Sequence, residues 1–127
     1  MGDYRDLKAW NASRELALVT YHVTENFPAA ERFGLVAQMR RAAVSVMSNI
    51  AEGAGRASDR QFAPFLRIAS GSLRELESQA ILSLDLGYCP ATAHDELNQA
   101  SLTAGRLLFG LLRSVEERIA RDMSHRS

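Results

Sequence analysis

Apolar residues recur every three or four positions in four stretches of the chain, which is the spacing of amphipathic helices. These stretches cover about residues 6–26, 30–54, 59–87 and 92–122. No run of β-branched and aromatic residues alternates with polar ones, so no strand is predicted. Four such helices with short links pack most simply as an all-α, antiparallel up-down-up-down four-helix bundle, a single domain over residues 1–127.

Turn and capping residues indicate where the first three helices begin and end. Phe27-Pro28 closes the first, because a residue before proline avoids the α region. Gly53 and Gly55 are expected to stop the second in the left-handed conformation. Ser58 begins Ser-Asp-Arg-Gln, which has the spacing of a capping box for the third helix.

Proline positions affect the last two helices. Pro64 would remove a hydrogen bond inside the third helix, so that helix either bends or begins nearer Ala63. The fourth follows Pro90 and is expected to be capped by Thr92. The last residues, 123–127, are expected to fray.

Each helix has a face that is expected to enter the core. On the first helix this face carries Leu7, Trp10, Ala17, Tyr21 and Thr24. On the second it carries Leu35, Met39, Ala42, Val46, Ile50 and Gly53. The third contributes Phe62, Leu66, Ala69, Leu73, Leu76, Ala80 and Leu84, and the fourth Leu97, Ala104, Leu108, Leu111, Val115 and Ile119.

A polar line runs directly beside the apolar stripe of the second helix. It consists of Gln38, Arg41, Ser45, Asn49 and Glu52. Polar groups this close to a core should be partly buried and hydrogen-bonded. Glu77 lies near the centre of the third helix's core stripe and needs a partner, for which Arg41 is the candidate. We interpret the line and Glu77 as a polar network at a helix or subunit junction.

Apolar residues also occur outside the core stripes of the third and fourth helices. They are Ile68, Leu82 and Leu86, near the small Gly71, together with Leu102 and Phe109. Isolated surface leucines are normal, but contiguous apolar surface indicates a subunit interface. The residues therefore favour a homo-oligomer.

Charge and composition narrow the possible chemistry. The 15 basic and 15 acidic residues cancel, so nucleic-acid binding would need a local patch, for which Arg56, Arg60 and Arg67 are the candidates. The single cysteine excludes an internal disulfide and indicates a reducing compartment, the cytoplasm. We find neither a signal peptide nor a long apolar run, so no membrane association is expected.

Catalytic and metal motifs are not evident. No Glu lies three residues before His22, His94 or His125, as a di-iron bundle would require. Gly53-Ala54-Gly55-Arg56 closes a helix, whereas a phosphate loop opens one. The sequence therefore predicts no catalytic residue, no metal site and no cofactor.

Several segments together resemble a known family. They are Asp6-Leu7-Lys8-Ala9-Trp10, residues 21–28, Glu31-Arg32-Phe33-Gly34-Leu35, residues 38–41, residues 49–53 (Asn-Ile-Ala-Glu-Gly), residues 65–69, Gly71-Ser72, Glu75-Leu76-Glu77 and Leu86-Gly87-Tyr88. In order and spacing they resemble the bacterial four-helix-bundle proteins first noticed in intervening sequences of 23S ribosomal RNA genes.

The resemblance implies an antiparallel bundle that assembles as a homopentamer, with no established enzymatic activity. This family is also similar to the accessory variability determinant of diversity-generating retroelements, a basic pentamer that binds a reverse transcriptase and nucleic acid. The neutral charge of this chain departs from that relative. The leading hypothesis is a non-enzymatic oligomeric scaffold or adaptor, and the alternative is an accessory protein that binds RNA, DNA or a nucleic-acid enzyme.

Overall fold

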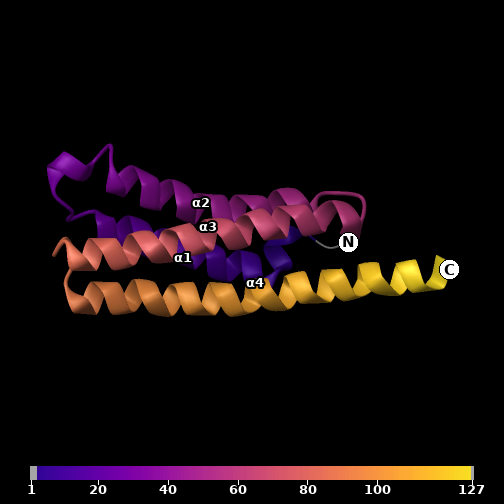
Figure 1. The fold of residues 1–127 in the computed structure, drawn as a ribbon. Coiled ribbons are helices and arrows are strands. Elements are labelled where there is room, and N and C mark those ends of the chain that lie inside the picture. Colours follow the sequence, from indigo (N-terminus) through magenta and orange to yellow (C-terminus); the bar gives the residue numbers. More distant parts are fainter. Residues whose placement is uncertain (1–2, 127) are drawn as a thin grey trace.

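Four long helices lie side by side in the computed structural model, which describes residues 3–126 (Figure 1). They are α1 (Lys8–Thr24), α2 (Leu35–Ala54), α3 (Asp59–Asp85) and α4 (Ala91–Arg126). Short 3-10 helices, η1 (Tyr4–Asp6) and η2 (Ala29–Glu31), precede α1 and α2. Within the described residues there is no strand, and each helix contacts the next while α1 also contacts α4. The predicted all-α four-helix bundle is confirmed.

The core stripes predicted for α2, α3 and α4 are largely confirmed. Met39, Val46 and Ile50 of α2 are fully buried, as are Leu66 and Leu76 of α3. On α4 the buried residues are Leu97, Ala104, Leu108 and Val115, while Leu111 and Ile119 pack at the edge of the core.

The core face predicted for α1 was partly wrong. Tyr21 is 45% exposed, and the helix instead buries a face that includes Ser13, Leu16 and Thr20. The hydroxyls on this face donate to carbonyls one turn earlier, from Ser13 to Ala9 and from Thr20 to Leu16, both at 2.7 Å. A hydroxyl satisfied in this way enters a core without an unpaired polar group. These polar residues therefore hid the true face from an apolar pattern.

The glycines at the end of α2 act differently from the expectation. Gly55 has a φ of −80°, which is not left-handed. Among the described residues the positive φ is that of Gly87, at 74°. Gly87 ends α3 in a Schellman motif. The Tyr88 amide donates to the Ser83 carbonyl oxygen at 2.9 Å, and the Gly87 amide donates to the Leu84 carbonyl oxygen at 2.9 Å. Gly53 is buried instead, where a Cβ would lie 2.6 Å from Phe65 Cβ. Its role is close helix packing.

The capping residue predicted for α3 is confirmed, but a start near Ala63 was wrong. Ser58 Oγ accepts from the Gln61 amide at 3.2 Å, and Gln61 Oε1 accepts from the Ala57 amide at 3.2 Å. The helix begins at Asp59 and includes Pro64. Proline's fixed φ is helical, and Pro64 is exposed, so the unpaired carbonyl one turn earlier can meet water.

The boundaries of α4 also differ from the sequence expectation. The His94 amide donates to Pro90 oxygen at 3.0 Å, so the helix begins before Thr92. It continues through Met123 to Arg126, where fraying was expected, while Ser127 lies outside the described residues. Figure 1 shows its last turns extending past the first turn of α3, at the end of the bundle opposite to the α3–α4 connection. No helix in the described part is long and apolar enough to cross a membrane.

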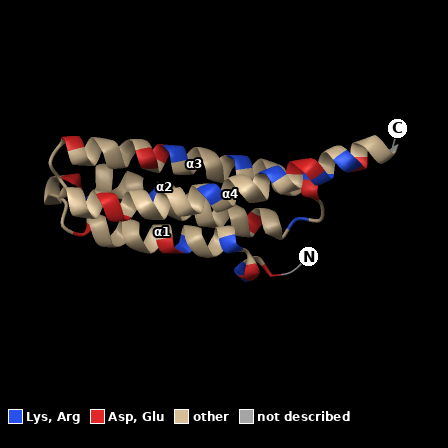
Figure 2. Cartoon of the chain, turned by 90° about the horizontal axis from the view of Figure 1, so that it is seen from below, with Lys and Arg blue, Asp and Glu red and all other residues tan. Residues whose placement is uncertain are grey.

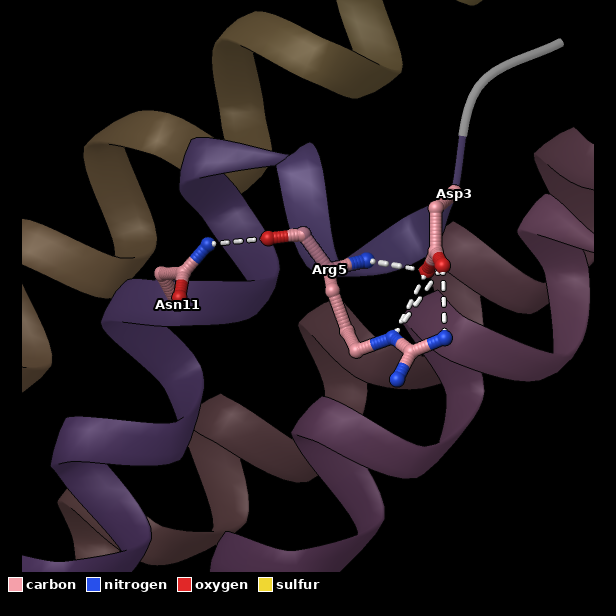
Figure 3. Close-up of polar contacts among 3 residues, drawn as sticks. All are labelled: Asp3, Arg5 and Asn11. Atoms are coloured by element: carbon pink, nitrogen blue, oxygen red, sulfur yellow. Dashed lines mark hydrogen bonds and ion pairs between the residues drawn. The ribbon is translucent and has the colours of Figure 1, made fainter.

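The N-terminal segment is tied to α1 by polar contacts (Figure 3). Asp3 Oδ1 accepts from the Arg5 amide at 2.9 Å, and the Arg5 guanidinium contacts both carboxylate oxygens at 2.7 to 3.1 Å. These hydrogen bonds lower the pKa of Asp3. Asn11 Nδ2 donates to Arg5 oxygen at 2.8 Å, which connects η1 to the helix.

Candidate functional site

The polar line of α2 meets polar residues of α3. Arg41 donates to Gln38 Oε1 at 2.9 Å and also pairs with Glu75. Gln79 Nε2 donates to the same Glu75 oxygen at 3.3 Å. Arg41 and Glu75 remain 58% and 41% exposed, so this end of the network lies at the surface.

The middle of the polar line is half-buried and links the two helices. Ser45 Oγ lies 2.8 Å from Ser72 Oγ, and Asn49 Nδ2 donates to Ser45 Oγ at 3.1 Å and to Ser45 oxygen at 2.8 Å. Glu52 is exposed and pairs with Arg56 at 3.4 Å. The structure thus brings Gln38, Arg41, Ser45 and Asn49 to the junction of α2 and α3, whereas Glu52 faces outward.

Glu77 does not pair with Arg41, so that hypothesis was wrong. Its carboxylate contacts Arg74 at 3.0 Å on its own helix. Glu75 and Glu77 are two residues apart, which is about 200° around a helix, so only Glu75 can face α2. Glu77 faces the groove between α3 and α4.

The six residues predicted as an oligomer surface are all exposed, but they divide between two sides of α3. Leu102 (54%) and Phe109 (66%) line a groove of about 270 Å³ between α3 and α4, beside Arg74, Glu77 and Arg106. Ile68 (54%), Leu82 (49%) and Leu86 (50%) lie on the other flank of α3. Gly71 is also exposed, and a Cβ added at this position would have no other atom within 4 Å outside its own helix backbone.

The three arginines considered for nucleic-acid contact differ in their partners. Arg56 lies 4.8 Å above the Phe65 ring and also contacts Glu52, while Arg67 pairs with Glu116 at 3.2 Å. Arg60 is exposed and makes no side-chain hydrogen bond or ion pair with the described residues. Figure 2 shows basic and acidic residues alternating towards this end of the bundle, which does not form a uniform basic patch.

A second pocket, between α1 and α2, was missed by the sequence reasoning. It has a volume of about 460 Å³ and is lined by Tyr21, Arg32, Phe33, Val36, Ala37, Arg40, Arg41 and Val44. Phe33 is 87% exposed. The assignment of Tyr21 to the core concealed this pocket, and the adjacent Arg32-Phe33 pair was the available signal.

Two polar contacts fix the ends of the bundle. Arg118 donates to both oxygens of Asp59 at 3.0 Å, and these bonds lower the pKa of Asp59 and raise that of Arg118. At the opposite end, Tyr88 donates from its hydroxyl to Glu31 Oε2 at 2.9 Å, which raises the pKa of Tyr88. Glu31 Oε1 accepts from the Leu35 amide at 3.1 Å, so one carboxylate joins two connections.

Within the described residues, no group of three or more His, Cys, Asp or Glu side chains is placed to hold a metal ion. Cys89 is buried, with its sulfur 3.7 Å from Ser83 Oγ. Apolar side chains, arginines and carboxylates occur together on outer faces of the bundle, as in the α3–α4 groove. These features define a helical-bundle protein whose candidate site is a set of interaction surfaces.

The chain belongs to the family of 23S rRNA-intervening sequence proteins, whose family model matches residues 5–110. A similar solved structure is the crystal structure of a protein with unknown function from the S23 ribosomal protein family of Bacteroides thetaiotaomicron VPI-5482. It superposes with a TM-score of 0.76 at 22% identity, over 83% of this chain and 95% of that one, which supports the fold alone. No curated protein matches the chain significantly.

Proposed function

We propose that this protein is a non-enzymatic scaffold or adaptor that acts as a homo-oligomer, a pentamer in keeping with the family resemblance. The observation that carries the proposal is exposed apolar surface on two sides of α3: Phe109 (66% exposed) and Leu102 (54%) line the groove between α3 and α4, and Ile68 (54%) lies outside that groove. Side chains of this size are normally covered when they cluster, and a second subunit is the simplest cover. We place the protein in the cytoplasm, where a lone cysteine stays reduced.

The mass of the protein in solution tests this proposal. Light scattering after size exclusion, at micromolar concentration, should give five times the 14.0 kDa of one chain. A monomer under these conditions would contradict the assembly on which the scaffold depends.

Nucleic-acid binding is a second candidate, supported by Arg60, which is exposed and has no ion pair among residues 3–126. Avidity in an oligomer would multiply a weak contact at each copy. A gel shift with structured RNA and single-stranded DNA at several salt concentrations separates the two candidates. Binding that weakens steeply with salt, and that Arg60→Ala reduces, would favour an accessory nucleic-acid role. If neither nucleic acid is retarded at low salt, only the scaffold proposal remains.

A further inference from the structure

A basic and aromatic surface covers the end of the bundle where α1 meets α2. We define the basic-aromatic patch as Tyr21, Arg32, Phe33, Arg40 and Val44, which line one pocket. The Arg40 guanidinium lies 4.5 Å above the Tyr21 ring and donates from Nε to Thr24 Oγ1 at 3.0 Å and from Nη2 to the Tyr21 carbonyl oxygen at 3.3 Å. Arg32 lies 5.4 Å above the Phe33 ring. Stacking leaves the edge of the Arg32 guanidinium and Nη1 of Arg40 able to donate hydrogen bonds to a carboxylate.

Neither Arg32 nor Arg40 forms an ion pair within the described residues. The carboxylates nearest in the chain do not neutralise them. Glu31 is occupied by Tyr88 and the Leu35 amide. Glu25 lines a second pocket together with both arginines, but it forms no ion pair in the described part. Two positive charges beside exposed aromatic rings therefore remain available to an acidic and apolar partner.

A surface of the opposite character lies on the last turns of α3. We define the acidic-apolar patch as Ile81, Leu82, Asp85 and Leu86, with Asp95 of α4 beside the connecting turn. The three apolar side chains are 57%, 49% and 50% exposed, respectively. Asp85 and Asp95 are exposed and form no ion pair among the described residues. This patch offers carboxylates within an apolar surface.

The two patches lie at the same end of the bundle. Tyr88, just past α3, donates to Glu31, which directly precedes Arg32 in the chain. The Phe27 and Tyr88 rings also pack, with centroids 5.8 Å apart. The patches nevertheless face different sides, because one lies over α1 and α2 and the other on α3. In Figure 1 this is the end where the α1–α2 and α3–α4 connections lie.

We propose that the basic-aromatic patch of one copy of this chain binds the acidic-apolar patch of the next copy. The inference rests on the oligomer proposed above and names the surfaces that join it. Arg32 and Arg40 would receive Asp85 and Asp95, while Phe33 and Tyr21 cover Leu82 and Leu86. Both patches gain what they lack, since apolar area leaves water and each charge finds an opposite partner.

Charge excludes the simpler arrangement in which each patch meets its own copy. A two-fold contact would set arginines against arginines, or Asp85 against Asp85, and like charges at an interface are unfavourable. A contact between two different patches is head-to-tail: it forms a closed ring where the rotation between neighbouring copies closes, and an open filament where it does not. Since both patches lie at the same end of the bundle but face different sides, successive copies in the proposed assembly stand side by side around a ring.

Two charge-and-apolar variants test this pairing. Arg32→Glu with Phe33→Ser disables the basic-aromatic patch, and Leu82→Ser with Asp85→Arg disables the acidic-apolar patch. Each variant alone should fall from the wild-type mass to that of a single 14.0 kDa chain by light scattering. Mixed in equal amounts, they should form a dimer that grows no further, because each supplies the one patch that the other has lost.

The matched control is Arg14→Glu with Leu18→Ser, which removes an exposed arginine and an apolar side chain that is 54% exposed on α1. It should keep the wild-type mass, and circular dichroism should show all three variants folded. A monomeric wild type would overturn the scaffold proposal itself. An oligomeric wild type whose two patch variants keep its mass, or whose monomeric variants fail to pair on mixing, would overturn only this pairing.

Discussion

Gly53 shows how closely α2 and α3 approach at the level of single atoms. A Cβ at this position would lie 2.6 Å from Phe65 Cβ and 2.8 Å from Phe62 Cδ1, so the helices would have to separate. We expect Gly53→Ala to lower the free energy of unfolding by about 1 to 3 kcal/mol, as overpacking does. Urea denaturation measures the change.

Gly71 provides the control for that substitution. It also lies within a helix, but nothing is within 4 Å of a built Cβ. Gly71→Ala should therefore stabilise the protein by up to about 1 kcal/mol through helix propensity alone. If both alanines shift stability in the same direction, the close approach at Gly53 is not a packing constraint.

The Arg41 contact is expected to matter little for stability. Since Arg41 and Glu75 are both partly exposed, Arg41→Ala should cost at most about 1 kcal/mol. A double-mutant cycle should show coupling of Arg41 to Glu75 and none to Glu77. Coupling to Glu77 in thermal denaturation would instead restore the pairing expected from the sequence.

At the residue scale, the sequence predicted buried positions correctly where the buried side chains are apolar, and incorrectly where polar side chains are buried. The α2 stripe was read correctly because its buried residues are apolar or small. The α1 face was misread because Ser13 and Thr20 are buried with their hydroxyls bonded to the helix's own carbonyls. Such local satisfaction leaves no mark in an apolar periodicity.

At the scale of elements, the cap that begins α3 was easier to predict from the sequence than the effect of Pro64 within the helix. Ser58 caps the start as expected, since a capping box is a local pattern. For Pro64 the sequence left a bend or a later start open. The later start was wrong because it weighed one lost hydrogen bond, whereas Phe62, Ala63 and Leu66 are buried around the proline. Tertiary packing of the first turns offsets the loss.

The bidentate contact between Asp59 and Arg118 makes the join of α3 and α4 sensitive to acid. Because the folded pKa of Asp59 is lowered, its contribution is present above the unfolded value of about 3.9 and is lost as pH falls through the folded value. Arg118→Met should destabilise by about 1 kcal/mol or less at pH 7, since Arg118 is 40% exposed.

That difference should vanish at a pH below the folded pKa of Asp59, where the wild type has lost the same contact. Chemical denaturation of both proteins between pH 2 and 7 checks the trend. Arg113→Met is the control on the same helix, because its Glu117 partner lies on α4 itself. A deficit for Arg118→Met that is constant with pH would show that packing, and not charge, is responsible.

At the scale of the whole molecule, Tyr88 holds together the two connections at one end of the bundle. Its raised pKa means that the hydroxyl's stabilising contribution is present below its unfolded value of about 10 and is lost as pH rises through the folded value. Tyr88→Phe should therefore be less stable than the wild type at pH 8, with the gap closing at alkaline pH. Chemical denaturation of the wild type and of Tyr88→Phe, at pH 8 and at a pH above the folded pKa of Tyr88, tests this.

Tyr4→Phe is the matched control, since Tyr4 packs edge-on against Trp10 without a hydroxyl hydrogen bond among the described residues. In the proposed ring, Tyr88→Phe should also weaken assembly, because the loop carrying Arg32 and Phe33 would lose its anchor. Unchanged assembly with lowered stability would separate the anchor from the interface.

The bundle and its family could be predicted from the sequence, whereas the arrangement of its outer surfaces could not. Periodicity assigned Leu82 and Leu86 to the outside, and the predicted topology puts them at the same end of the bundle as Phe33, but neither could show how the two connections at that end are joined. That relation depends on the Tyr88–Glu31 contact, which joins residues 57 positions apart. Surface geometry of this kind arises only when the connections are folded.

The last turns of α4 extend the helix beyond its contact with α3. The family match ends at residue 110, yet the helix continues unbroken to Arg126, beyond the Arg118 contact that anchors it to α3. A helical fusion spliced in phase onto this end would advance about 1.5 Å and turn about 100° with each added residue. The number of residues inserted would thus set both the distance and the direction of a fused domain relative to the bundle. A series of such fusions could be used to determine how the bundle is oriented.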